Sequence, residues 1–235
     1  MIAVSVVSHG HGTMVAHLLS QLRGCSDVTR IVLTLNIPEA LLVEEDALVQ
    51  IIRNATPKGF GANHNAAFHR CRESYFCVLN PDIELNGNPF PALIECIEGS
   101  GAALAAPLIV SPSGGMEDNA RHFPTVGALL RKAFGGHDGR YAIGTSSARF
   151  SPDWVAGMFM LFRSSEFAAL KGFDESYYLY YEDVDICKRA RLAGMEVTAC
   201  PTVQAIHDAR RASRRNLRHM RWHLASMLRY LWRHG

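Results

Sequence analysis

Four short stretches of the sequence place polar side chains where they could do chemistry. The first is the strand-like run YFCVL (75–79), which is followed at once by Asn80, Pro81 and Asp82. In open parallel sheets, ligands bind beyond the carboxyl ends of the strands, so Asp82 stands where a site is expected. A carboxylate on a tight turn suits Mg²⁺ or Mn²⁺, which take oxygen ligands and bridge to substrate phosphates. A plain Asn-Pro-Asp turn is the other interpretation.

The second stretch is the glycine-containing segment NATPKGFGANHNAA (54–67). Gly59 and Gly61 allow close backbone approach, and a helix that starts near Ala62 would direct N–H groups toward an anion. The segment matches neither the phosphate-binding loop GxxxxGK[ST] nor the dinucleotide fingerprint GxGxxG. On local evidence, an ordinary glycine turn between a strand and a helix is therefore the favoured interpretation.

The third stretch, YYEDVDICKRARLAG (180–194), puts three acids beside two tyrosines and ahead of three cations. Glu182 and Asp183 are candidate acid–base groups. They also fit the first turn of a surface helix, because the helix dipole favours acids there and cations further on, and Asp185 suits the same explanation. The fourth candidate is His207, which closes a strand-like run and is either a metal ligand or a structural histidine.

Apolar runs rich in valine and isoleucine alternate with helix-like patterns, which predicts an α/β fold with a mostly parallel sheet. We expect strands at 2–8, 31–35, 48–52, 75–79, 102–106, 108–110, 154–162 and 195–200. Helices are expected at 62–73, 89–98, 126–134, 164–172, 182–193 and 213–233, with another that carries Val15, Leu18, Leu19 and Leu22. Residues 111–150 lose this periodicity and are predicted to form a flexible loop, which in a compact domain is usually functional.

The bulk composition fits one sizeable α/β domain, because 48% of the 235 residues are apolar and 20% are charged. No run approaches the roughly 18 apolar residues of a membrane-spanning helix. The first ten residues lack a basic region and are interpreted as a core strand rather than a signal peptide. The six cysteines (25, 71, 77, 96, 187 and 200) form no CxxC pair, which predicts reduced thiols in a cytoplasmic protein.

Taken together, these stretches resemble the inverting glycosyltransferases of family 2, which have the GT-A nucleotide-sugar fold, over nearly the whole chain. VSVVSHGH is similar to their first strand and nucleotide-facing loop, and VLNPDIEL to the LNPDv form of the DXD metal motif. NATPKGFGANHNAA resembles the N-x-GFaxaxN segment. MEDNARHFPT resembles the D-x-aR-x-fPT segment of bacterial rhamnosyltransferase-like members that act on surface polysaccharides. The most specific match is the block from VAGMFMLFR to YYEDVDICKRARLAG (155–194).

The resemblance implies a role for each stretch. Asp82 and His207 would hold the divalent cation, Mg²⁺ or Mn²⁺, and Asp183 would be the general base that deprotonates the acceptor hydroxyl. A glycan or lipid-linked saccharide acceptor would contact Glu182, Tyr180 and Tyr181. The nucleotide-sugar donor is expected to be dTDP-L-rhamnose, with a UDP-hexose or UDP-N-acetylhexosamine as the alternative. It would contact Ser8, His9, Asn36, Lys58, Gly59, Phe60, Asn65, Asn80 and Asp82.

Several departures from the family pattern affect these roles. Asn36 stands where many members have an aspartate at the end of the second strand, and SHGH (8–11) replaces the common T-Y-N. Asn80 replaces the first aspartate of DXD, so fewer protein carboxylates would hold the metal. RHMRW (218–222) echoes the R-x-x-R-W motif of processive synthases, but we interpret it as part of an ordinary helix because membrane helices are absent. Pyrophosphorylases of the same fold class have a glycine-rich G-x-G-T-R-L-type loop that this sequence lacks.

We predict a catalytic domain over residues 1–207, with a nucleotide-sugar-binding half in 1–106 and an acceptor-binding half in 107–207. A basic amphipathic helix follows in 208–235, where eight arginines stand against one acid. Its apolar face would pack on the domain or on a second subunit in a homodimer, or would lie on an anionic membrane. A location in the cytoplasm, peripheral at the inner face of the membrane, follows. A nucleic-acid-binding module is the non-enzyme alternative, but the aromatic residues of the tail lie among leucines, so we expect no nucleic acid partner.

Overall fold

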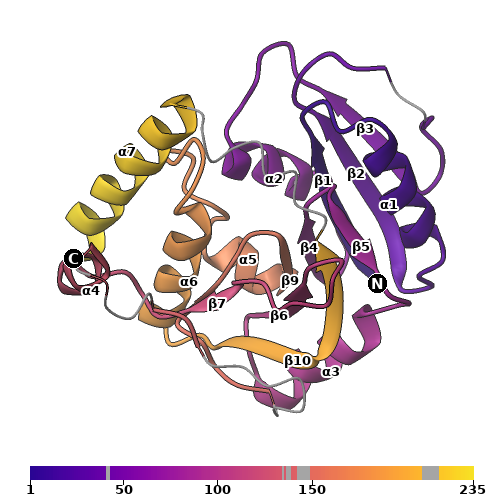
Figure 1. Ribbon diagram of the computed structural model, residues 1–235. Helices are drawn as coiled ribbons and strands as arrows, with labels where there is room; N and C mark the ends of the chain where they lie inside the picture. Colours follow the sequence, from indigo (N-terminus) through magenta and orange to yellow (C-terminus); the bar gives the residue numbers. More distant parts are fainter. Residues whose placement is uncertain (41–42, 134, 136–138, 142–148, 208–216) are drawn as a thin grey trace.

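The computed structural model describes residues 1–40, 43–133, 135, 139–141, 149–207 and 217–235. Its centre is an eight-stranded sheet in the order β3-β2-β1-β4-β9-β6-β10-β5 (Figure 1). Four strands at one side run parallel: β1 (Ile2–Ser8), β2 (Val28–Leu35), β3 (Val49–Arg53) and β4 (Tyr75–Leu79). β6 (Leu104–Val110) and β10 (Val197–His207) are also parallel to each other. β9 (Phe159–Arg163) runs antiparallel between β4 and β6, so the sheet is mixed but mostly parallel, as predicted.

Helices cover both faces of the sheet, because its strands are apolar on both sides. Alternate residues of β1 pack into two separate apolar clusters, with Ile2 and Val4 in one and Ala3 in the other. The first cluster includes α1 (Thr13–Arg23) and α3 (Phe90–Ser100). The second includes α2 (Phe60–Phe68), α5 (Ser164–Ala169) and α6 (Glu182–Leu192). The predicted inward face of α1 is confirmed, since all four of its residues are buried: Val15, Leu18, Leu19 and Leu22.

Several predicted strand boundaries are wrong, and the differences position the site. The predicted pair 102–106 and 108–110 is the single strand β6. The predicted strand 154–162 is two strands, β9 and β8 (Trp154–Val155), and β8 pairs with β7 (Ala120–Arg121) in a separate small sheet. β10 continues to His207, where it pairs with β5 (Ile83–Leu85).

The region 111–150, predicted to be a loop with a helix at 126–134, contains that helix as α4 (Val126–Ala133) and, in addition, the short strand β7. Residues 134, 136–138 and 142–148 lie outside the described residues, so the predicted flexibility stays a prediction.

The C-terminal helix α7 (Leu217–His234) packs beside α6, on the side away from the sheet (Figure 1). Its Tyr230 forms a third apolar cluster with Tyr177, Tyr181 and Val184. The Ser226 hydroxyl donates a hydrogen bond of 2.9 Å to the Leu179 carbonyl oxygen. One face of this helix therefore packs on the domain. None of the described helices is long and apolar enough to cross a bilayer.

Two of the cysteines are paired, which corrects the prediction that all six are reduced. Cys96 and Cys200 form a disulfide, whereas Cys25, Cys71, Cys77 and Cys187 are free and buried. The pair is 104 residues apart in sequence and lies between α3 and β10. Spacing rules could not have found it, because only the packing of this helix on this strand brings the two residues together.

Candidate active site

A cavity of about 500 Å³ opens at the carboxyl ends of β1, β2 and β4, where a nucleotide site is expected. Residues from six separate segments of the chain meet there, including the turn after β4 and the glycine-containing segment. Of the nine predicted donor-binding residues, six line this cavity: His9, Asn36, Lys58, Phe60, Asn80 and Asp82. The structure thus brings together most of the predicted donor site.

Asn36 joins the end of β2 to the glycine-containing segment. Its Oδ1 accepts hydrogen bonds from the Lys58 backbone N–H (2.8 Å) and from Asn54 Nδ2 (2.9 Å). Its Nδ2 donates to the Lys58 carbonyl oxygen at 2.9 Å. With its side-chain amide engaged in this way, Asn36 holds the wall of the cavity in shape while also lining it.

The other three predicted donor residues lie behind the cavity wall. Ser8 is fully buried, and its Oγ accepts a hydrogen bond from the His11 backbone N–H at 3.2 Å. Gly59 leaves room for the 178 backbone, since a Cβ here would lie 2.7 Å from the Tyr178 carbonyl oxygen. Asn65 accepts from the Phe173 N–H and donates to its carbonyl oxygen, both at 2.9 Å. These residues support the site from outside the cavity rather than line it.

Asp82 and His207 converge at the edge of this cavity, although they lie 125 residues apart in sequence. The antiparallel pairing of β5 with β10 sets His207 opposite Ile83, directly after Asp82. Nε2 of His207 lies 3.2 Å from Oδ2 of Asp82, and Nδ1 lies 2.6 Å from Oε2 of Glu117. Burial lowers the pKa of His207, but the two carboxylates outweigh it and raise the pKa to about 9.

The chemistry of this pair fits a divalent cation. A carboxylate is a suitable ligand for Mn²⁺ or Mg²⁺, an imidazole is a common metal ligand, and the buried Oδ1 of Asp82 has no hydrogen-bond partner in the structure. Within the part of the chain that the structure describes, no group of three or more acidic, histidine or cysteine side chains is arranged around one point. A cation at Asp82 and His207 would therefore take its remaining ligands from substrate phosphate and water.

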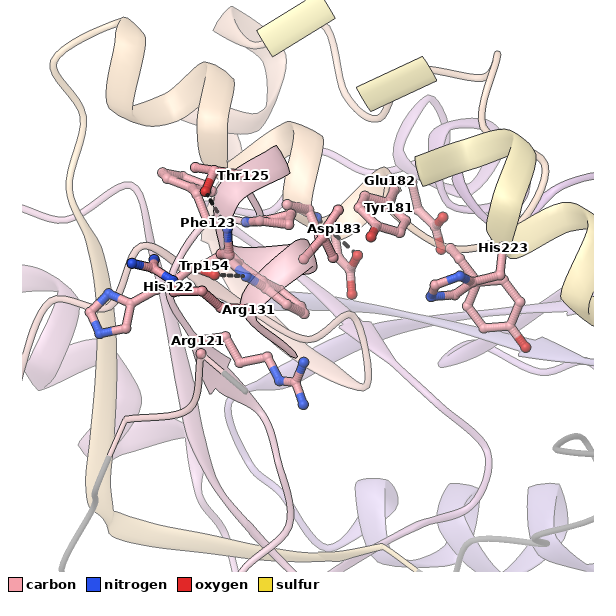
Figure 2. Close-up of a pocket in the computed structure, with 16 residues that line it drawn as sticks. Arg121, His122, Phe123, Thr125, Arg131, Trp154, Tyr181, Glu182, Asp183 and His223 are labelled. Carbon is pink, nitrogen blue, oxygen red and sulfur yellow. Dashed lines mark hydrogen bonds between the residues drawn. The ribbon is translucent and has the colours of Figure 1, made fainter. Parts of the chain in front are cut away.

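A second cavity of about 650 Å³ contains the predicted base and all three predicted acceptor-binding residues (Figure 2). Tyr180, Tyr181, Glu182 and Asp183 form one part of its wall. Other parts come from β7, β8, α4 and α7, so the cavity lies between the predicted acceptor-binding half and the C-terminal helix. The four predicted residues thus face one space large enough for a sugar.

The segment 178–183 separates the two cavities. Tyr178 and Leu179 line the first cavity, and the next four residues line the second. This change of side requires an unusual backbone, because Tyr180 and Tyr181 adopt φ of 70° and 68°. Left-handed conformations cost non-glycine residues energy, and they persist where the surrounding structure enforces them, often at functional sites.

Asp183 and Glu182 are held in different ways. Asp183 accepts hydrogen bonds from the backbone N–H of Gly157 (3.0 Å) and of Val184 (2.9 Å) at the start of α6. Oε2 of Glu182 is buried without a partner. Burial raises the pKa of both carboxyls, and the Asp183 charge raises that of Glu182 further, whereas the backbone N–H groups oppose the rise at Asp183. The backbone N–H groups therefore favour the ionised form of Asp183, whereas Glu182 Oε2 has no such donor.

Comparisons with known proteins identify the family of this chain. A model of the family described as "Glycosyl transferase family 2" matches residues 34–161. Rhamnosyltransferase WbbL of Escherichia coli (strain K12) is 30% identical, over 98% of this chain and 92% of its own. The chain belongs to glycosyl transferase family 2. A second relative of this glycosyltransferase is the N-acetylglucosaminyl-diphospho-decaprenol L-rhamnosyltransferase of Mycobacterium tuberculosis (strain ATCC 25618 / H37Rv), 28% identical over 57% of this chain and 47% of its own.

Solved structures share the fold of this glycosyltransferase. GalNAc-T7 with UDP, GalNAc and Mn²⁺ superimposes with a TM-score of 0.70 at 16% identity, over 92% of this chain and 44% of that one. Mannosyltransferase PcManGT from Pyrobaculum calidifontis, in complex with GDP-Man and Mn²⁺, gives 0.65 at 10% identity, over all of this chain and 64% of its own. The predicted GT-A fold is confirmed, and the chain spans less than two thirds of either solved chain.

The structure of this glycosyltransferase also adds residues that sequence reasoning missed. Arg218 and Trp222 of α7 line the first cavity, and His223 lines the second. The stretch RHMRW is helical as predicted, but it also forms cavity wall, and its echo of R-x-x-R-W was the available signal. Sequence reasoning did not single out Glu117, because the family motif D-x-aR-x-fPT begins at the neighbouring Asp118.

Asp185 is an anchor rather than a solvated acid of a first helical turn, which corrects our interpretation of it. Its carboxylate is fully buried. Oδ2 lies 2.7 Å from Nε of Arg189, and Oδ1 lies 2.8 Å from Nε2 of His234. Asp185 therefore ties α6 of the glycosyltransferase to α7, while Asp183, two residues earlier, faces a cavity.

Proposed function

We propose that this chain transfers a sugar from a nucleotide donor to a saccharide acceptor with inversion of configuration at the sugar C1. The observation that carries the proposal is the shared segment 178–183. It has Asp183 on the wall of one cavity and borders the other cavity, which is lined by Asp82 with His207 beside it. The donor occupies the cavity beyond β1, β2 and β4, and the acceptor occupies the cavity at the start of α6.

The donor in this proposal is dTDP-L-rhamnose, and the acceptor is a lipid-linked saccharide at the inner face of the cell membrane. The names of the two rhamnosyltransferase relatives support this choice, one of them with a diphospho-decaprenol acceptor. The second candidate donor is a UDP-hexose or UDP-N-acetylhexosamine, which is favoured by the UDP in the GalNAc-T7 structure that shares the fold.

On the donor side, Lys58 and Asn80 border the space for the donor, and Asn36 holds the Lys58 backbone in place. A divalent cation held by Asp82 and His207 would neutralise the charge that grows on the leaving diphosphate. Nδ1 of His207 is held by Glu117, which leaves Nε2 directed toward Asp82. The protein residues thus orient the leaving group before any bond breaks.

On the acceptor side, Asp183 takes the proton of the attacking hydroxyl. The hydroxyl oxygen forms its bond to C1 from the face opposite the diphosphate, and the bond from C1 to the diphosphate oxygen breaks with its electron pair on that oxygen. The backbone N–H groups of Gly157 and Val184 hold the Asp183 carboxylate in position. Glu182 lines the same cavity, where its carboxyl is available to form a hydrogen bond with the acceptor.

The test is a transfer assay with purified protein, Mn²⁺, a prenyl-diphosphate-linked saccharide and a panel of nucleotide sugars. We expect product only from dTDP-L-rhamnose, with the opposite anomeric configuration to the donor by NMR. A clear preference for UDP sugars would replace the rhamnose assignment by the second candidate. A product with retained configuration would contradict the direct displacement by an acceptor that Asp183 deprotonates.

A further inference from the structure

The C-terminal helix α7 has two apolar faces, and only one of them is covered. The inner face carries Ser226 and Tyr230, which are buried against the 177–181 segment, with Met227 and Leu231 partly buried beside them. The opposite face carries five large apolar side chains at intervals of three or four residues, each between 51% and 87% exposed. This outer stripe consists of Leu217, Met220, Leu224, Leu228 and Trp232.

The charge on this helix has one sign. Residues 217–234 contain no aspartate or glutamate. Arg221 and Arg229 are exposed, and the helical period of 3.6 residues puts them on or beside the outer stripe. Arg233 is engaged with Asp174 on the domain. The outer face of α7 thus combines an apolar stripe with exposed positive charge, the pattern of a helix that lies in the plane of a membrane surface.

We infer that the outer stripe of α7 binds the surface of an anionic lipid bilayer, with the helix axis parallel to the membrane. The arginines match the negative headgroups, and the leucines and Trp232 enter the boundary between headgroups and acyl chains. A polyanion such as nucleic acid would match the arginines but not the apolar stripe. An antiparallel pairing of two copies along the stripe would set Arg221 of each copy near Arg229 of the other, which places like charges together.

The inference goes beyond sugar transfer, because the binding needs neither donor nor acceptor. It has a consequence for the proposed acceptor site, however, since His223 of the same helix lines the second cavity. Hydrogen bonds from Ser226 and His234 fix α7 to the domain, so a bound helix holds that cavity beside the bilayer. A saccharide on a lipid carrier would meet the cavity without leaving the membrane.

The experiment measures co-sedimentation of the whole chain with phosphatidylcholine vesicles, with and without phosphatidylglycerol. We expect binding to the anionic vesicles that weakens as salt is added. The double variant Leu224→Gln/Leu228→Gln should lower the partition coefficient by about tenfold or more, since two apolar side chains no longer enter the bilayer. Leu192→Gln is the matched control, because Leu192 is also 69% exposed but lies on α6, and it should bind as the unaltered chain does.

Quenching by brominated lipid provides a second readout that does not depend on a destabilising change. The fluorescence of Trp232 should be quenched in anionic vesicles, and Trp232→Phe should abolish that quenching while the other two tryptophans remain. Absence of vesicle binding, or binding equal in the double variant and the control, would overturn the inference. A chain that sediments as a dimer, and becomes a monomer in the double variant, would assign the stripe to a second copy instead. Transfer to a water-soluble acceptor should be unchanged in the double variant, so the two proposals fail separately.

Discussion

Two acidic clusters lie on opposite sides of the 178–183 segment, and they use carboxylates for opposite purposes. In the donor-side cluster, His207 lies between Asp82 and Glu117, so each nitrogen of its imidazole ring faces a carboxylate. In the acceptor-side cluster, Glu182 and Asp183 adjoin each other, and the hydrogen bonds to Asp183 come from backbone N–H groups. Similar residue types thus prepare one place for a cation and the other for a proton. The difference comes from the neighbours of each carboxylate, not from the carboxylates themselves.

The largest effect is expected from Asp183→Asn, which removes the proposed base and keeps the shape of the side chain. We expect transfer to fall by roughly 10²- to 10⁴-fold, the usual contribution of a general base, with donor affinity nearly unchanged. Steady-state transfer rates and calorimetric titration with dTDP would measure the two quantities. Glu182→Gln is the matched control, and because Glu182 is not the proposed base, this variant should lose far less transfer activity. Lost donor affinity with transfer chemistry preserved would contradict the assignment.

Removal of the cation tests the donor-side cluster. We expect EDTA to abolish transfer and Mn²⁺ to restore it, because the leaving diphosphate needs its charge neutralised. Asp82→Ala should weaken metal-dependent donor binding by about 10- to 100-fold, which titration of dTDP with and without Mn²⁺ would measure. Full activity in EDTA would exclude the metal role of Asp82 and His207.

Glu117→Gln tests whether the orientation of His207 matters for the cation. The carboxylate of Glu117 fixes the imidazole through Nδ1, and outer partners of this kind usually change metal affinity by about 10-fold or more. Mn²⁺ affinity measured by electron paramagnetic resonance gives a readout independent of transfer. Glu84→Gln is the control, since Glu84 is exposed on β5 close to Asp82. Equal Mn²⁺ affinities in both variants would leave Glu117 without a positioning role.

The acceptor-side cluster should make both the transfer rate and the stability of the protein depend on pH. Burial raises the pKa of Asp183, so transfer should decline on acidification at a pH above the usual carboxyl range. The same shifts affect stability with the opposite sign, because a carboxyl whose folded pKa is raised binds protons more tightly when folded. Glu182 and Asp183 therefore favour the folded state at low pH and lose that contribution as pH rises. In thermal unfolding, Glu182→Gln should raise the midpoint more at neutral than at acidic pH, and an equal shift at both would contradict this.

Local patterns predicted the elements that depend on local sequence. The strands 2–8 and 75–79 match the structure in both bounds, and the buried face of α1 follows its leucine spacing. The resemblance named Asp82, His207 and Asp183, and the structure places each on a cavity wall or beside one. Spacing alone could not join Asp82 to His207, because their proximity depends on β10 continuing to pair with β5.

The failures of prediction all concern long-range contacts. Asn65 matched a donor-binding motif, yet its side chain holds the Phe173 backbone, 108 residues away. Cys96 and Cys200 meet only because α3 packs on β10. The insertion of β9 between β4 and β6 separates it from β8, and the left-handed backbone of Tyr180 and Tyr181 has no signature in residue type. Each of these features is decided by a partner that a window of sequence does not contain.

Because the two cavities share the segment 178–183 as a wall, we expect binding in one to affect binding in the other. A donor that displaces Tyr178 moves the same stretch of backbone that carries Tyr181 and Asp183 toward or away from the acceptor. If the donor changes the affinity for the acceptor by some factor, the acceptor changes the affinity for the donor by the same factor, because a coupling free energy is reciprocal. Any such coupling between the two substrates would pass through the six residues 178–183.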